Sequence, residues 1–169
     1  MTAAVGIGVA LSLLLQLNQE AVDLTVVRLE LRQDGRFVEA EAPATLPSEE
    51  VTLLDVYGSL LFAGARTLQT RLPDPARSER PVVVLRLRGR TTLGATAFIV
   101  LADYAERLGV AGGHLFLSGV DRTLLKQLEK THRLDLRGAV TVVPASETVV
   151  ESTHKARDAA AAWLASHDT

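Results

Sequence analysis

Three arginines spaced two residues apart, Arg86, Arg88 and Arg90, form the most regular charged pattern in the sequence. They follow an apolar run that reads as a strand. Because residues i and i+2 of a strand point to the same face, the three guanidinium groups are expected to point the same way. Such a row could bind an acidic partner or a nucleotide phosphate. The simpler interpretation is a solvated basic edge of the sheet.

Other residues that could form a metal site, a phosphate-binding loop or a catalytic nucleophile lack the spacing that such sites need. The histidines do not form a metal-ligand pattern, and the glycines after residue 108 follow a predicted helix rather than open one, which indicates a turn. Ser118-Gly119 lacks the flanking residues of a nucleophile elbow. The residues concerned are His114, His132, His154, His167, Gly109, Gly112 and Gly113. We therefore expect no enzyme, no bound metal and no cofactor.

Composition narrows the class of protein further. The chain has 169 residues, of which 47% are hydrophobic and 4% aromatic, so its core must be built from Leu, Val and Ala. That composition suits an α/β domain. A net charge of -2 argues against nucleic acid or an anionic membrane as a partner. The absence of cysteine excludes disulfides, a thiolate nucleophile and a Cys-based zinc site.

An apolar run occupies residues 3–15, with Ser12 as its one polar side chain. A bilayer span needs about 20 such residues, and the flanks lack the charge and cleavage site of a secretory signal. The apolar run has three interpretations: an incomplete transmembrane helix, an uncleaved anchor or a core helix. We favour the first, because apolar residues occupy every face of the helix. The predicted division is a membrane-type helix over 1–19, a connector with a strand hairpin over 20–50, and a domain over 51–166 whose fold begins near residue 24.

The predicted elements alternate after an opening strand pair. Residues 24–31 read as a strand, Asp34-Gly35 as a hairpin turn, residues 36–40 as the return strand and 41–50 as a loop. Strands at 51–57, 81–87, 114–117 and 139–143 are each followed by a helix. The helices are expected at 61–72, 95–108, around 124–128 and after Pro144. Repeated strand-then-helix units predict an α/β fold with a mostly parallel sheet and an antiparallel edge.

Helix ends and buried faces follow from the same pattern. Gly109 is expected to end the second helix, Asp121 to cap the third and Ser146 to cap the last. The last helix should turn one set of side chains inward: Val149, Val150, Ala156, Ala160 and Trp163.

The order of these elements resembles the STAS fold, named for sulfate transporters and anti-sigma-factor antagonists. Residues 56–65 (Val-Tyr-Gly-Ser-Leu-Leu-Phe-Ala-Gly-Ala) are similar to a segment of SulP-type anion transporters in which a strand ends at a glycine before an apolar helix start. Residues 117–120, running into 124–130 and 134–135, are similar to the family's penultimate strand and helix. The hairpin at 34–37 and the apolar run upstream fit the SulP subtype. The resemblance spans roughly residues 24–164.

In STAS regulators, the loop before the second helix carries an Asp-Ser-Ser/Thr-Gly-like motif whose hydroxyl a kinase phosphorylates. Alignment through Leu101 and Tyr104 puts Leu93 at the Asp position and Ala95 at the acceptor, and neither can play that role. Thr92 and Thr96 are then expected to cap the helix rather than accept phosphate.

The resemblance implies a non-catalytic regulatory module that lacks the transport core. Its partner would be the membrane portion of a transporter or a cytosolic protein, with additional membrane contact through the N-terminal helix. The candidate partner loops are Thr91, Thr92, Ala95, Thr96, Gly119 and Arg122. The expected location is the cytoplasmic face of the bacterial inner membrane. The alternative is a stand-alone cytoplasmic switch of the anti-sigma-antagonist kind.

Overall fold

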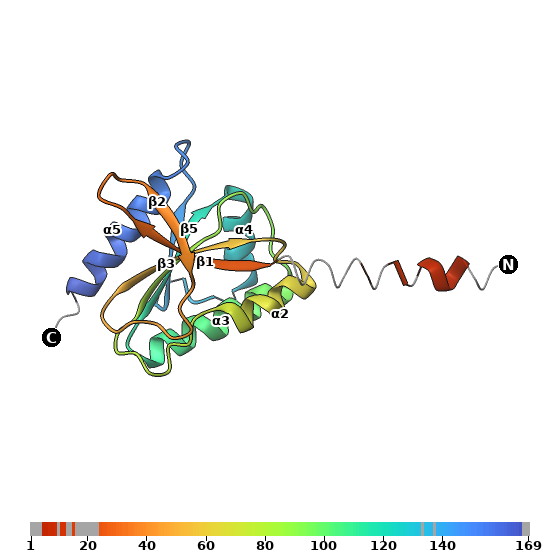
Figure 1. Ribbon diagram of the computed structural model, residues 1–169, viewed down its shortest axis with the longest axis horizontal. Helices are drawn as coiled ribbons and strands as arrows, with labels where there is room; N and C mark the ends of the chain where they lie inside the picture. The colour runs from red at the N-terminus through yellow and green to blue at the C-terminus, as the bar shows by residue number, and fades with distance from the viewer. Residues whose placement is uncertain are drawn as a thin grey trace.

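The computed structural model describes residues 5–9, 11–12, 15, 24–132, 134–136 and 138–166. Six strands form one sheet in the order β2-β1-β3-β4-β5-β6 (Figure 1). They are β1 (Thr25–Leu31), β2 (Phe37–Glu41), β3 (Val51–Tyr57), β4 (Val82–Arg86), β5 (His114–Val120) and β6 (Val140–Pro144). The helices are α2 (Phe62–Arg71), α3 (Ala95–Val110), α4 (Arg122–Thr131) and α5 (Glu151–Ser166).

The sheet is mixed, as the alternation of elements predicts. β1 pairs antiparallel with both β2 and β3, and the steps from β3 through β6 are parallel. The hairpin turn is confirmed, because Gly35 adopts a φ of 80° and its N–H donates to the Arg32 carbonyl. A side chain at position 35 would be strained in that conformation.

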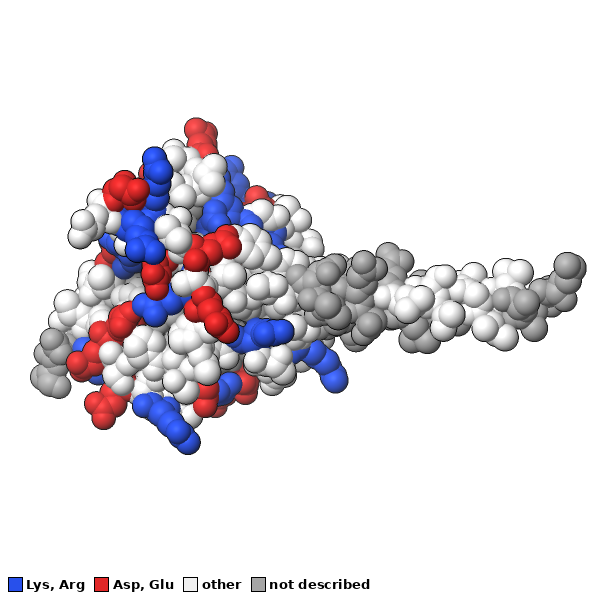
Figure 2. All heavy atoms as spheres, in the orientation of Figure 1, with Lys and Arg blue, Asp and Glu red and all other residues white. Residues whose placement is uncertain are grey.

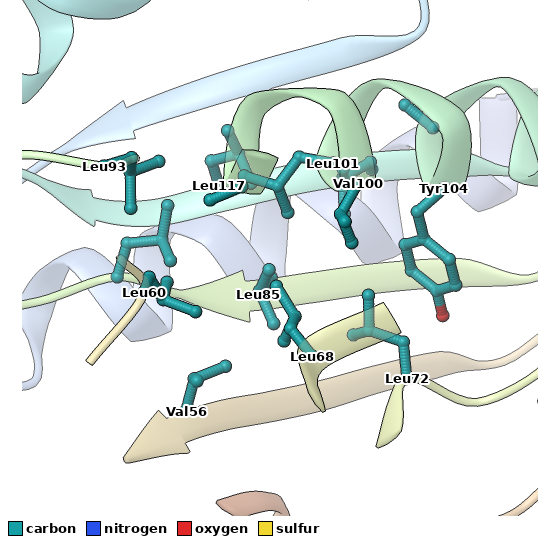
Figure 3. Close-up of a cluster of buried hydrophobic side chains, with 14 of the residues drawn as sticks. Val56, Leu60, Leu68, Leu72, Leu85, Leu93, Val100, Leu101, Tyr104 and Leu117 are labelled. Atoms are coloured by element: carbon teal, nitrogen blue, oxygen red, sulfur yellow. The ribbon is translucent and has the colours of Figure 1, made fainter. Parts of the chain in front are cut away.

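The main core lies between the sheet and helices α2, α3 and α4. Leu and Val side chains fill it, with Tyr104 the largest side chain that is fully buried (Figure 3). Along β4, Val83 and Leu85 point into this core, whereas Val82 and Val84 point to the opposite face. All four are completely buried, as expected for a parallel strand covered on both faces.

A smaller core lies on the opposite face, where α5 covers the sheet (Figure 1). Ala156 and Ala160 of α5 are fully buried against apolar side chains of the central strands. Those side chains are Leu53, Val82, Val84 and Phe116. In the described part of residues 24–166, α5 thus covers this face, and α2, α3 and α4 cover the other.

The structure corrects the predictions for α5. The helix begins at Glu151, so Ser146 lies five residues ahead of it and does not cap it. Instead, the Ser146 hydroxyl donates to the Thr148 carbonyl within the preceding loop. Val149 and Val150 are 59% and 41% exposed and do not face inward. Ala156 and Ala160 are buried as predicted, and Trp163 is half-buried against His114.

Helix α3 also ends later than expected, at Val110 rather than before Gly109. Gly112 has a φ of 71°, and the Gly113 N–H donates to the Leu108 carbonyl. This arrangement satisfies a terminal carbonyl of the helix by means of a left-handed residue. The glycine that stops α3 is therefore Gly112.

The described residues of the N-terminal run have helical backbone, and Val5, Ile7 and Val9 are more than half exposed. Those exposed side chains contradict a helix buried in the core. The rest of the predicted helix over 1–19 lies outside the described residues. In the described part of the chain, no helix has the length and apolar character needed to cross a membrane.

Candidate docking site at the carboxyl edge of the sheet

The candidate partner loops lie along one edge of the sheet. Parallel strands end at the same edge, so the loops after β3, β4, β5 and β6 meet there. We call residues 56–61, 87–94, 119–121 and 145–150, with the first two turns of the helices that follow them, the carboxyl edge. The Leu87 N–H donates to the Ser118 carbonyl, and this bond joins the β4 loop to β5 at the edge.

The three arginines do not form the predicted solvated basic row. Arg86 is the last residue of β4, and its guanidinium group forms an ion pair with Asp55 of β3. The side chains of Asp55 and Arg86 are 7% and 19% exposed. Asp55 also accepts a hydrogen bond from the Val56 N–H. The sequence could not reveal this pair, because its members are 31 residues apart.

Arg88 and Arg90 tie neighbouring loops together. Arg90 donates to the carbonyls of Val56 and Gly58, the latter at 2.7 Å. Burial lowers the pKa of Arg90 from its ordinary value. Arg88 donates to the carbonyls of Ser146 and Thr148, at 3.1 and 3.4 Å. Both arginines thus donate to backbone carbonyls of the carboxyl edge and stabilise the arrangement of its loops.

The start of α3 differs from the prediction that Thr92 and Thr96 cap it. Gly94 is the N-cap, and no side chain caps the helix. Gln127 of α4 instead holds the backbone of Leu93, accepting from its N–H at 3.1 Å and donating to its carbonyl at 2.9 Å. This clamp, together with the burial of the Leu93 side chain, fixes where the helix begins. Thr91, Thr92 and Ala95 are left exposed.

The second candidate loop, residues 119–121, is confirmed as a helix entry. Asp121 caps α4 by accepting from the Thr123 N–H at 2.7 Å, which also lowers the pKa of Asp121. Gly119 has a φ of 71°, and a Cβ there would lie 3.3 Å from the Arg88 Cα. Glycine is therefore required for the close approach of the two loops. Arg122 is exposed beside them.

Most of the large apolar side chains exposed in the described part of residues 24–166 belong to the segments of this edge, a feature that sequence reasoning missed. They come from the β3 end, the α2 and α3 starts and the loop before α5. Tyr57 is 44% exposed, Leu61 49%, Ile99 52%, Val149 59% and Val150 41%. Within residues 24–166 as described, Val38 and Val110 are the other large apolar side chains exposed to this degree. Exposed apolar side chains are a feature of protein interaction sites, which makes this edge the candidate docking site.

On the face shown in Figure 2, acidic and basic side chains are intermingled, without a large area of one sign. Nor do the described residues contain a cluster of three or more His, Asp or Glu arranged to hold a metal ion. The feature that distinguishes the carboxyl edge is its apolar side chains.

A hydrogen bond to Glu39 of β2 raises the pKa of the Tyr57 phenol to about 12. Because this pKa exceeds the ordinary value, the bond stabilises the fold fully below about pH 10. The stabilisation is then lost as the pH rises through the folded-state value. In a Tyr104→Phe background, which leaves Tyr57 as the one tyrosine, absorbance titration should show ionisation near pH 12. Adding Glu39→Ala should move it toward pH 10, and titration near pH 10 without that change would contradict the assignment.

The architecture is that of an α/β domain with a mixed sheet, opened by an antiparallel hairpin and continued by parallel strand-helix units. The model of the STAS domain family matches residues 42–151. Since this match covers more than half of the chain, the protein belongs to the STAS domain family. STAS domains are generally non-catalytic domains that bind or regulate other proteins. No curated protein and no solved structure matches the chain.

Proposed function

We propose that the chain is the regulatory STAS module of a SulP-type anion transporter and docks on the membrane portion through its carboxyl edge. The exposed apolar side chains that four segments of that edge carry are the observation behind the proposal. The ties from Arg88 and Arg90 hold these segments in a fixed arrangement. A preformed surface loses less conformational freedom on binding than a mobile one. The module itself transports nothing and catalyses nothing.

The residues at the phospho-switch position support a docking module over a kinase-controlled switch. Ala95 stands at the acceptor position, and it has no hydroxyl. Leu93, at the position of the motif's Asp, is 3% exposed and belongs to the main core. A carboxylate in the place of Leu93 would be buried among apolar side chains, which is costly.

The second candidate function is a stand-alone switch of the anti-sigma-antagonist kind, located in the cytoplasm. The exposed hydroxyls of Thr91 and Thr92 beside the α3 start favour it, because added negative charge there would alter the same edge. Under the leading proposal, the domain lies at the cytoplasmic face of the bacterial inner membrane, and the apolar N-terminal residues add membrane contact. Nucleotide binding by the arginines is the weakest alternative, since all three have acceptors within the protein.

Site-specific photo-crosslinking in the native cell tests the docking surface and its partner together. A photoreactive phenylalanine analogue replaces Ile99 at the carboxyl edge or, as the control, Val110 at the opposite end of α3. Both side chains are exposed, at 52% and 86%, so neither change should unfold the domain. We expect a crosslink from position 99 to a polytopic transporter and none from position 110, with mass spectrometry identifying the product.

The other outcomes decide between the alternatives. A crosslink from position 99 to a kinase or a sigma-factor regulator would favour the switch. So would stoichiometric phosphate on Thr91, Thr92 or Thr96 in the same mass spectra. Equal crosslinking from positions 99 and 110 would contradict the carboxyl edge as the docking site.

A further inference from the structure

Helix α5 is held to the sheet by a much smaller apolar surface than α3. The two helices have the same length, 16 residues. Helix α3 buries seven side chains, all of them apolar or aromatic. Helix α5 buries four, of which Ala156 and Ala160 are apolar and small, and Ser152 and Thr153 are polar. Because burial of apolar area supplies most of the packing free energy, α5 is the more weakly held helix.

The contact beneath the first turn of α5 contains buried hydroxyls that no hydrogen bond satisfies. Among the described residues, Ser152 Oγ, Thr153 Oγ1 and Ser118 Oγ of β5 have no hydrogen-bond partner. All three residues are at most 1% exposed. A buried hydroxyl without a partner disfavours the closed state, since water would satisfy it on opening. The hydroxyls therefore lower the free energy needed to lift α5.

Two aromatic contacts hold the helix along the rest of its length, together with Leu164, whose carbonyl accepts from Arg80 at 2.8 Å and whose side chain packs against the smaller core. Trp163 stacks on His114 at the start of β5, with ring centroids 5.0 Å apart. His154 contacts Phe37 of β2, with centroids 4.9 Å apart. Neither contact touches α2, α3 or α4, whose side chains belong to the separate main core. Opening α5 would leave that core intact.

We infer that α5 is a releasable latch, which opens from the sheet while the rest of the domain stays folded. Its release uncovers an apolar strip on the central strands: Leu53, Val82, Val84 and Phe116. Residues 145–150 are its hinge, and Arg88 holds them through the carbonyls of Ser146 and Thr148. Because Arg88 belongs to the carboxyl edge, any contact that draws its side chain away also frees the hinge.

The chain has no cysteine, so a single introduced thiol reports local opening. Ala160→Cys places the thiol under α5, and Ala97→Cys places a matched thiol under α3. Both alanines are 0% exposed. Under native conditions, a soluble disulfide reagent should label position 160 at least about tenfold faster than position 97, because sub-global opening precedes global unfolding. The rate at position 160 should also depend weakly on urea, since a local opening exposes little surface.

Equal labelling rates with equal urea dependence would overturn the latch. Amide hydrogen exchange of the unmodified chain provides a readout independent of any substitution. There, the α5 amides should exchange faster than those of α3 in the same ratio as the thiols. Arg88→Met should accelerate labelling at position 160 at least about threefold and leave position 97 unchanged, whereas Arg122→Met, at the same edge, should alter neither. These measurements use the chain alone, so they can fail or succeed whatever the crosslinking shows.

Discussion

Replacing Asp55 with alanine is expected to lower the free energy of unfolding by about 3–5 kcal/mol, because it leaves a largely buried arginine without its counter-ion. The Arg86 side chain is 19% exposed, so water reaches little of it. The change also removes the acceptor of the Val56 N–H. Urea denaturation followed by circular dichroism measures the loss.

The exposed pair between Arg28 and Glu50 is the matched control. Its N···O distance is 2.8 Å, but the side chains are 30% and 50% exposed. Breaking it with Glu50→Ala should cost at most about 1 kcal/mol. The double variant Asp55→Leu/Arg86→Met should recover most of the stability lost by Asp55→Ala, because it leaves no buried charge. A loss from Asp55→Ala as small as that of the control would show that Arg86 finds water or another acceptor.

Phe98→Ala is expected to destabilise the domain by about 3–5 kcal/mol, because it leaves a cavity in the main core. Phe98 is 1% exposed and lies in the first turn of α3. The adjacent residue, Ile99, is 52% exposed on the other side of the helix. Ile99→Ala should therefore change stability by no more than about 0.5 kcal/mol.

The two substitutions separate folding from docking. Urea denaturation should show the large effect for Phe98→Ala alone. With the photoreactive analogue moved to Val149, which is 59% exposed at the same edge, a loss of crosslinking caused by Ile99→Ala would then be assigned to the surface and not to unfolding. If both variants lost stability equally, Ile99 would belong to the core, and its proposed part in docking would be wrong.

Local sequence patterns predicted the strands well. The prediction of a strand at 51–57 matches β3 residue for residue, and Asp121 caps α4 as its position before the helix indicated. These features depend on neighbours within a few residues: apolar runs, turn glycines and capping side chains. The antiparallel opening hairpin was predictable for the same reason, since Asp34-Gly35 defines its turn.

The carboxyl edge was harder to predict, because its side chains find partners far along the chain. Arg86, Arg88 and Arg90 pair with groups 31 to 60 residues away, and Gln127 reaches Leu93 across 34 residues. Spacing along a strand predicts the face that a side chain occupies but not the acceptor it meets. The cap of α3 was mispredicted for this reason, since the Gln127 clamp decides where the helix begins.

The loop before α5 shows a second limit of periodicity. Val149 and Val150 fit an apolar stripe of a helix that begins near Ser146, and that pattern predicted them to be buried. In the structure, Arg88 holds the carbonyls of Ser146 and Thr148 in a loop, so the helix begins five residues after Ser146. Val149 and Val150 therefore lie at the surface, where they belong to the candidate docking site.

The strand order leaves β2 and β6 as the two outermost strands, and each discourages a further chain from pairing with it. Glu39 and Glu41 place carboxylates along the five residues of β2. β6 is also five residues long and ends at Pro144, which has no N–H to donate. Short edge strands with charge or proline resist edge-to-edge association between molecules. The domain can therefore expose the apolar side chains of its carboxyl edge with little tendency to polymerise through its sheet.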